Sequence, residues 1–318
     1  MRKSLRSFAD EVGPDGPVTV AGGKTQWEIG GVPAPGTREV SAPVGVVAYE
    51  PAEMIVRVGA GTSLAEVGST IKEGGQFVAL EADDPSHATV GGVLAVGRSG
   101  YRRLGWGHVR DSVLEMTSVS ARGEVIRSGA PLVKNVTGYD LCRLWVGSLG
   151  TLALTGEVVL RCLPIPRAET WWVGRDTDPF AVASQLYRPL SVLWDGEQTW
   201  VGLAGHRVDV EDQARTILGP HFLPTDGPPP LPGALRRSLL PRALKGLPSQ
   251  AGVGAGWLAQ VGVGVVHCSA DAAERIGPVV PPSLEVSELQ RAVKERFDPA
   301  GRLNPGRSAS RAAQGVSA

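Results

Sequence analysis

The first half of the chain alternates short β-type runs with a helical pattern. Met54 to Val58 is an apolar run of strand length. Thr62-Ser63 then offers N-cap side chains to a helix that Gly74-Gly75 ends. Ala121-Arg122-Gly123 separates two strand-like runs and predicts a hairpin. The pattern predicts strands over 18–20, 54–58, 112–120, 124–128 and 151–163, and helices over 64–73 and 140–146.

The pattern weakens after Pro164-Ile165-Pro166, where a small α+β domain is expected. Residues 224–250 carry seven prolines and are interpreted as a long exposed loop. The last residues have the composition of a disordered tail. Expected strands cover 170–173, 191–195, 199–204 and 257–268, and expected helices cover 210–218 and 284–296.

The distribution of glycine and proline along the chain supports a division into two parts. Of the 42 glycines, 25 lie in residues 1–156, whereas 17 of the 25 prolines lie in residues 164–318. A hydrophobic content of 42% is ample for a packed core. The first half is therefore expected to be a regularly folded domain with many bare loops.

Charge and cysteine content exclude several classes of function. Lys+Arg and Asp+Glu both number 32, and this balance argues against a general nucleic-acid or anionic-membrane binder. Three widely spaced cysteines do not form a zinc or iron–sulfur motif. The start lacks the apolar core of a signal peptide, and there is no run of about 18 apolar residues. A cytoplasmic protein without direct membrane insertion is expected.

Two glycine-rich turns follow predicted strands. Ala21-Gly22-Gly23-Lys24-Thr25 exposes backbone amides that suit a phosphate or pyrophosphate, although a plain tight turn fits the segment equally well. The segment is not a P-loop, because Val18 stands where that motif needs glycine. Gly59-Ala60-Gly61 lacks the third glycine of a Rossmann motif, since Leu64 occupies its place. A packed strand-to-helix turn is the better interpretation there.

Further candidate binding residues lie in three dense motifs. Thr89-Val90-Gly91-Gly92 and the run from Gly100 to Gly107 would let backbone approach a flat or phosphorylated ligand. Both asparagines of the chain lie in such motifs, Asn135 in KNVTGYDL and Asn304 in FDPAGRLNPGR.

These segments together resemble a known family. VAGGKT, ATVGG, SGYRRLGWGHVRDSVL, VKNVTGYDLCRLWVGSLGTLALTGEVVL and FDPAGRLNPGR occur in this order. The ordered set resembles the vanillyl-alcohol-oxidase/PCMH family of FAD proteins, and within it is most similar to the FAD-binding subunits E of glycolate oxidases. The resemblance covers about residues 20–165 and 284–307.

The resemblance implies an α+β fold in which a PCMH-type pair of subdomains holds FAD beneath a small α+β cap. The implied division is an FAD-binding domain over 1–165, a cap over 166–283, a return to the FAD domain over 284–307 and a disordered tail over 308–318. The resemblance implies a cofactor-binding set for FAD of Ala21, Gly22, Gly23, Lys24, Thr25, Thr89, Gly91, Gly92, Gly100, Arg102, Arg103, Gly105, Asp111, Gly150, Thr151, Glu157 and Asn304.

The chain departs from the family at two kinds of site. Covalent members carry a histidine in the pyrophosphate loop, where this chain has Lys24 and Thr25, and Cys142 lies on a predicted helix. Non-covalent FAD is therefore expected. Related D-2-hydroxy-acid dehydrogenases hold a metal in a larger cap, but His206, His221 and His267 lie far apart, so no metal is expected.

The resemblance implies oxidation of a small 2-hydroxy acid such as glycolate, with hydride passing to flavin N5 and the hydroxyl proton to a base. His108 and His206 are candidates for that base, and the sequence selects neither. The main hypothesis is an FAD-binding subunit that works with a second flavoprotein subunit and an iron–sulfur subunit, through which it would associate with a membrane. Within that complex it would either take the hydride itself or relay electrons and complete the assembly. The alternatives are a stand-alone FAD dehydrogenase of another hydroxy acid or alcohol and a non-catalytic flavin-fold scaffold.

Overall fold

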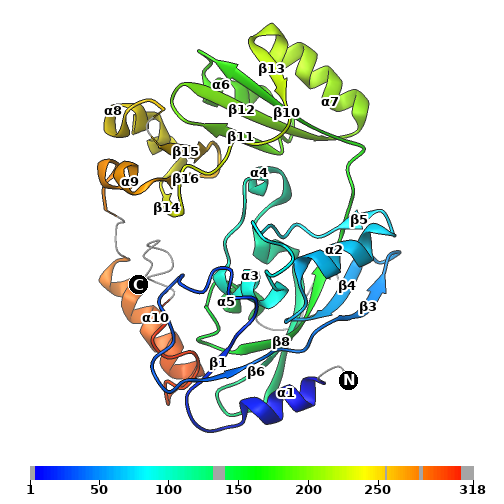
Figure 1. Cartoon of the computed structure of the whole chain (residues 1–318), viewed down its shortest axis with the longest axis vertical. Coiled ribbons are helices and arrows are strands. Elements are labelled where there is room, and N and C mark those ends of the chain that lie inside the picture. Colours follow the sequence, from blue (N-terminus) through cyan, green and yellow to red (C-terminus); the bar gives the residue numbers. More distant parts are fainter. Residues whose placement is uncertain (1–3, 132–139, 255, 279–281, 309–318) are drawn as a thin grey trace. The chain divides into compact units, whose positions relative to one another are not determined.

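The computed structural model describes residues 4–131, 140–254, 256–278 and 282–308. The chain divides into two compact units (Figure 1). The described residues of unit 1 fall in 4–100, 108–165 and 282–308, and those of unit 2 in 101–107, 166–254 and 256–278. Residues 101–107, which we expected in the FAD-binding domain, thus group with the second unit. The glycine and arginine pattern of that segment carries no signal of which unit it packs against.

Unit 1 is built around a five-stranded antiparallel sheet of order β3-β4-β8-β6-β7. A parallel pair, β1-β2, and a short antiparallel pair, β5-β9, complete it. Its strands are β1 Val18–Val20, β2 Arg38–Val40, β3 Val46–Glu50, β4 Ile55–Gly59, β5 Gln76–Phe77, β6 Val113–Val119, β7 Val125–Gly129, β8 Leu154–Arg161 and β9 Leu163–Pro164, and its helices are α1 Leu5–Val12, α2 Leu64–Lys72, α3 Val90–Val96, α5 Cys142–Trp145 and α10 Leu284–Phe297.

Helix α2 shows how the sequence pattern produces the core of unit 1. Ser63 caps the helix by accepting a hydrogen bond from the Glu66 amide, and Leu64, Val67 and Ile71 fall on one buried face. They pack in one cluster with Val56 of β4, among other apolar side chains of the sheet. Arg57 of β4 lies on the opposite face of the sheet, because strand side chains alternate between faces, and there it pairs with Glu115 of β6 at 2.8 Å.

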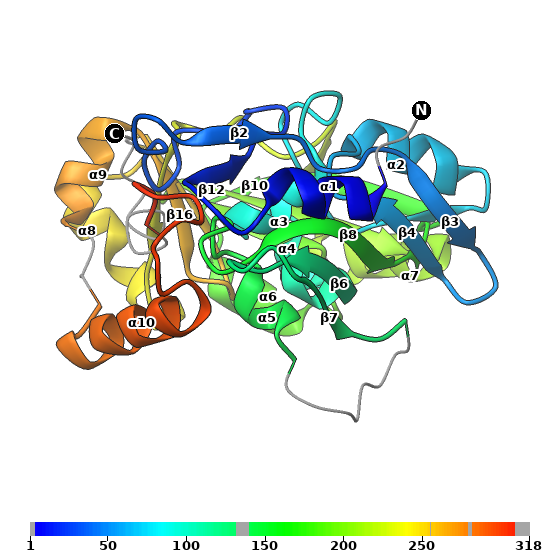
Figure 2. The same ribbon diagram turned by 90° about the horizontal axis from the view of Figure 1, so that it is seen from below.

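Helix α1 lies along β8 in unit 1 (Figure 2). A Cβ added to Gly156 of β8 would lie 2.6 Å from Leu5 and 3.1 Å from Phe8, so a bare glycine allows this close packing. The segment after α10 also lies in this region, since Leu303 forms a parallel bridge with Val18 of β1.

Unit 2 is a seven-stranded antiparallel sheet of order β13-β10-β12-β11-β15-β16-β14. Its strands are β10 Ala168–Arg175, β11 Ser191–Trp194, β12 Gln198–Gly205, β13 Phe222–Thr225, β14 Leu235–Ser238, β15 Trp257–Gln260 and β16 Val265–Cys268, and its helices are α4 Arg103–Trp106, α6 Pro179–Gln185, α7 Arg207–Gln213, α8 Leu247–Ala251 and α9 Ala270–Ile276.

Two predictions for this unit are wrong. Residues 257–268 are two strands and not one, because Gly262 and Gly264 adopt left-handed φ angles of 81° and 84° and turn the chain back. Residues 224–250 are not a long loop. They contain β14, a 3-10 helix over Pro241–Gly246 and α8, and Leu244 and Leu247 are fully buried. Prolines at the first helical positions begin these short helices.

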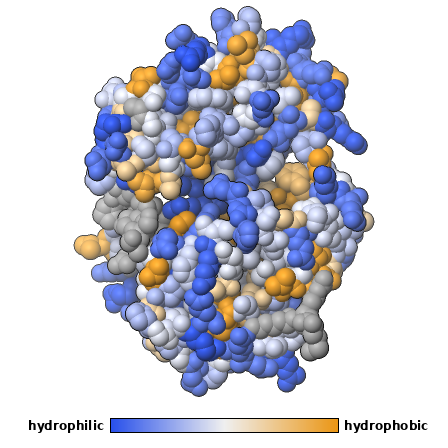
Figure 3. All heavy atoms as spheres, viewed as in Figure 1, coloured by the Kyte–Doolittle hydropathy of each residue, from blue (hydrophilic) through white to orange (hydrophobic). Residues whose placement is uncertain are grey.

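On the face shown in Figure 3, apolar side chains occur in small groups between polar ones. None of the helices in the described part of the chain combines the length and apolar character needed to span a bilayer.

Candidate functional site

A hollow in unit 1 collects most of the predicted binding residues. Its volume is about 940 Å³, including its open mouth. The walls come from the loop after β1, the start of α3, the turn before β8 and the C-terminal return. The predicted residues that line it are Ala21, Gly22, Gly23, Lys24, Thr25, Thr89, Gly91, Gly92, Gly150 and Asn304.

The loop over residues 21–25 presents bare backbone to the hollow. The Ala21 amide donates to the Val40 carbonyl at 2.9 Å and fixes the start of the loop. The amides of the next four residues donate to no atom of the described chain. Successive N–H groups left without acceptors form a concavity suited to an anion. Lys24 has a φ of 55°, which turns the chain at this point.

The glycines of this loop are required by its neighbours. A Cβ on Gly23 would lie 1.8 Å from the His87 carbonyl oxygen, and one on Gly22 would lie 2.4 Å from Thr89 Oγ1. Thr89 is also the N-cap of α3, accepting from the Gly92 amide at 3.2 Å. The two glycine-rich motifs therefore pack directly against each other, and they form one wall of the hollow.

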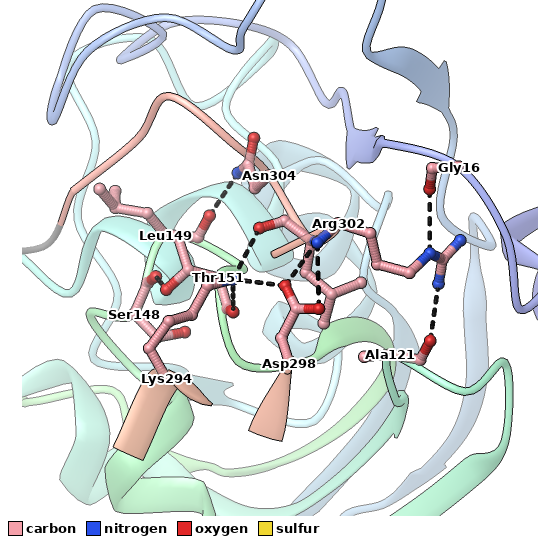
Figure 4. A network of polar contacts seen from close by, with 10 residues as sticks. Gly16, Ala121, Ser148, Leu149, Thr151, Lys294, Asp298, Arg302 and Asn304 are labelled. Atoms are coloured by element: carbon pink, nitrogen blue, oxygen red, sulfur yellow. Dashed lines mark hydrogen bonds and ion pairs between the residues drawn. The ribbon is translucent and has the colours of Figure 1, made fainter. Parts of the chain in front are cut away.

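The turn before β8 is held by the C-terminal return (Figure 4). Asn304 donates from its side-chain amide to the Leu149 carbonyl and accepts from Thr19 Oγ1 at 2.7 Å. Lys294 donates to the carbonyls of Thr151 at 2.7 Å and Leu303 at 3.1 Å. The return therefore fixes the shape of this wall through the peptide groups of the turn.

Three further predicted residues of unit 1 do not line the hollow directly. Thr151 donates to the Ser148 carbonyl at 2.7 Å and stabilises the turn. Gly100 approaches the Glu81 carboxylate so closely that a Cβ would lie 2.3 Å from it. Glu157 lies on β8, and its Oε2 is 4.0 Å from Arg57 Nη1 on β4.

The other predicted residues lie around the segment 101–111. Asp111 forms a capping box with His108, whose backbone amide donates to Asp111 at 3.0 Å. Arg102, Arg103 and Gly105 belong to unit 2. There, Arg102 pairs with Glu169 at 2.7 Å, and the Gly105 amide donates to the Leu190 carbonyl at 3.1 Å. A flavin contact for these residues stays a prediction.

Several lining residues were missed by sequence reasoning, among them Trp27, Trp145 and Arg307. Arg307 follows Asn304 within the NPGR motif, which was the available signal. Trp27 follows the glycine loop by two residues, and nothing in the local pattern marked its ring as part of a site. The KNVTGYDL motif with Asn135 lies mostly in 132–139, outside the described residues.

The chemistry of the lining residues fits a dinucleotide. Lys24 and Arg307 are the ionisable residues among them, and both are cationic. Trp145 Nε1 and Arg307 Nε are buried donors that find no acceptor in the described chain. Apolar side chains such as Met116 and Leu154 cover much of the remaining wall. Bare amides, cations and unmet donors beside apolar surface match a ligand with phosphates and a flat ring.

Two of the histidines considered from the sequence lie at helix starts, and a third lies on a strand. His108 accepts from the Arg110 amide through Nδ1 at 3.2 Å, which gives it a capping role. His206 is the exposed N-cap residue of α7. His267 lies 2.9 Å from the Gln260 side chain. Among the described residues, no group of His, Cys, Asp or Glu is arranged to hold a metal ion.

All three cysteines are buried, and burial suppresses ionisation of their thiols. It raises the pKa of Cys142 and of Cys162 to about 11, and it also raises the pKa of Cys268. At pH 8 the native protein should therefore react with a thiol reagent such as dithionitrobenzoate at none of its cysteines within minutes. Unfolding in guanidinium should release three thiols, and rapid reaction of the native protein would contradict this burial.

Residues 12–129 match the family model of the FAD binding domain. The chain is 28% identical to glycolate oxidase subunit GlcE of Escherichia coli (strain K12) over 92% of each chain. It is 32% identical to a D-lactate dehydrogenase of Anaerostipes hadrus over 48% of this chain, but spans only 32% of that protein. Among solved structures, an alkyldihydroxyacetonephosphate synthase superposes with a TM-score of 0.69 over 95% of this chain and 74% of that one, at 14% identity.

The fold and the hollow define an FAD-binding protein of the α+β, PCMH type. The chain contains an FAD binding domain and is similar to FAD-linked oxidoreductases, with a fold like that of vanillyl-alcohol-oxidase/PCMH-type structures.

Proposed function

We propose that this chain is the FAD-binding subunit of a complex that oxidises a small 2-hydroxy acid such as glycolate. The observation that carries the proposal is similarity to a glycolate oxidase subunit over 92% of both chains, together with a hollow whose walls suit FAD. The shorter matches to a D-lactate dehydrogenase and to glycolate oxidase subunit GlcD of Bacillus subtilis (strain 168) agree with a 2-hydroxy acid as the substrate class.

The residues that line the hollow would hold the cofactor. The free amides of the loop over 21–25 would bind its diphosphate, and the Ser148–Gly150 turn and Asn304 would border the adjoining part. Bound FAD would supply the two-electron acceptor for the oxidation of an alcohol to a carbonyl. Asn304 would act through the Leu149 carbonyl and keep that peptide group turned away from the ligand.

We expect the FAD to be dissociable. No histidine, cysteine or tyrosine is among the described residues that line the hollow, and Cys142 is a buried thiol with a pKa of about 11. Acid precipitation of the purified protein should therefore leave a colourless pellet and release the flavin into the supernatant. A pellet that stays yellow after repeated washing would contradict non-covalent binding.

The proposed function is tested by reconstitution. The chain should be co-expressed with a second flavoprotein subunit and an iron–sulfur subunit from the same source. The complex should reduce an artificial acceptor with glycolate, whereas the isolated chain should bind FAD but turn over glycolate at least tenfold more slowly. Loss of the complex activity when this chain is omitted is the matched control. Full turnover by the isolated chain would instead support a stand-alone dehydrogenase.

The partners also define where the protein would act. In this proposal a cytoplasmic chain reaches a membrane only through its partner subunits.

If neither the chain nor the complex retained flavin after gentle purification, the scaffold hypothesis would replace the proposed one.

A further inference from the structure

Trp27 and Arg307, which are far apart in the sequence, form one corner of the hollow. The guanidinium carbon of Arg307 lies 4.1 Å from the centre of the Trp27 ring, and Nη2 donates to the Trp27 carbonyl at 2.6 Å. Lys24 Nζ lies 4.7 Å from the same ring. The indole therefore lies within cation–π distance of two cations.

The two cations differ in how their charges are balanced. Lys24 donates to both carboxylate oxygens of Glu39, at 2.8 and 3.0 Å. Within the described chain, no carboxylate lies within ion-pair distance of Arg307, and its Nε is buried without an acceptor. Burial lowers the pKa of Arg307, and Glu28 and Glu39 oppose this from a greater distance. A guanidinium remains charged under these conditions, so the hollow contains a cation that lacks a paired anion.

The backbone that carries Arg307 is fixed on both sides. The Ala34 amide donates to the Pro305 carbonyl at 2.7 Å, and the Ser308 amide donates to the Gly30 carbonyl at 2.9 Å. Gly306 has a φ of 88°, and a Cβ there would lie 2.8 Å from the Ala34 nitrogen. The side chain of Arg307 therefore starts from a fixed position, which lowers the entropy cost of ligand binding.

We infer that Arg307, held against Trp27, binds a phosphate of the cofactor dinucleotide and makes the site prefer FAD to flavins without a phosphate. The planar guanidinium matches phosphate oxygens with a fork of donors, and stacking on an indole keeps that fork oriented. The diphosphate is the part of FAD that carries formal negative charge, so it is the natural partner of the unpaired cation. This inference rests on the proposed FAD site.

The test measures ligand affinity. Flavin-free protein is titrated by calorimetry with three ligands. FAD carries both the flavin and the adenosine diphosphate, ADP carries the adenosine diphosphate without the flavin, and riboflavin carries the flavin without a phosphate. R307M should weaken FAD and ADP about 10- to 100-fold and leave riboflavin unchanged, as expected for the loss of charged hydrogen bonds. R291M on α10 is the matched control, because Arg291 is exposed and lies outside the hollow, and it should change no affinity.

The remaining variants separate charge from orientation. R307K keeps the positive charge and should therefore retain part of the FAD affinity and its salt dependence. W27F keeps an aromatic ring beside Arg307 and should bind FAD nearly as the natural protein does. W27L removes the ring and should weaken FAD binding about as much as R307K. If R307M fails to fold, R307K and the salt dependence of FAD binding still decide the matter. An FAD affinity of R307M within twofold of the natural protein, or an equal loss for riboflavin, would overturn the inference. If the natural protein bound no FAD, the proposed function itself would fail.

Discussion

Replacement of Gly23 by alanine is expected to weaken FAD binding and to destabilise unit 1. The added Cβ would lie 1.8 Å from the His87 carbonyl oxygen and 2.6 Å from its carbon, so the two segments must separate by more than an ångström. The His87 region cannot simply retreat. The Ala88 amide donates to Asp84 at 2.8 Å, and the Ala88 carbonyl accepts from Leu64 at 2.9 Å.

The expected cost of this overpacking is about 2–3 kcal/mol in the free energy of unfolding. The FAD affinity should fall by at least about tenfold, because the loop and the α3 start would no longer form one wall. Urea unfolding followed by circular dichroism and titration with FAD are the measurements. G68A is the matched control. Gly68 lies in α2 with open space around its Cβ position, so alanine there should be neutral or stabilise by about 0.5–1 kcal/mol. G23A with unchanged stability and affinity would contradict the geometry of the loop.

Replacement of Arg302 by methionine is expected to produce the largest loss of stability. Arg302 is only 6% exposed, and its guanidinium donates to four backbone carbonyls, as Figure 4 shows for two of them. The distances are 2.9 Å to Gly16, 3.1 Å to Ala121, 2.9 Å to Val12 and 3.0 Å to Asp15. The side chain therefore joins the C-terminal return to the end of α1 and to the β6–β7 turn.

Methionine would fill part of the same space but leave the four carbonyls without this donor. The expected loss is about 3–5 kcal/mol, because hydrogen bonds to a charged group are strong and their buried partners would lose them together. The stability of R302K should lie between that of the natural protein and that of R302M, since one ammonium cannot reach carbonyls on several sides. R122M, which alters an exposed arginine in the β6–β7 turn, is the control and should change stability by less than about 0.5 kcal/mol. A loss of less than 1 kcal/mol for R302M, measured by urea unfolding, would show that the return is held by other contacts.

Local patterns predicted the elements whose ends are marked by short-range chemistry. The helix expected over 64–73 is α2, Leu64–Lys72, because the Ser63 cap and the apolar face act within a single turn. The hairpin around Ala121-Arg122-Gly123 is β6 and β7, because the turn residues determine it locally. The strand expected over 257–268 is divided in two, since Gly262 and Gly264 adopt positive φ angles between β15 and β16, and an apolar pattern with glycine also fits a continuous strand.

The candidate site likewise has parts that local patterns predicted and parts that they could not. The motifs identified the loop over 21–25, the α3 start and Asn304, because bare glycines and a rare asparagine are visible in the sequence. The pairing of Arg307 with Trp27 joins residues 280 positions apart. No local pattern can indicate which cation meets which ring across that distance.

The sequence by itself indicated the resemblance to FAD proteins, the FAD cofactor and the glycine loops, because these depend on residue types at fixed short spacings. Tertiary structure alone decided which of those residues meet in one hollow, which cation there lacks an anion, and how the C-terminal return is held by Arg302. The physical reason is that close packing and the pairing of buried charges depend on distances between segments, and the linear order of residues does not state those distances.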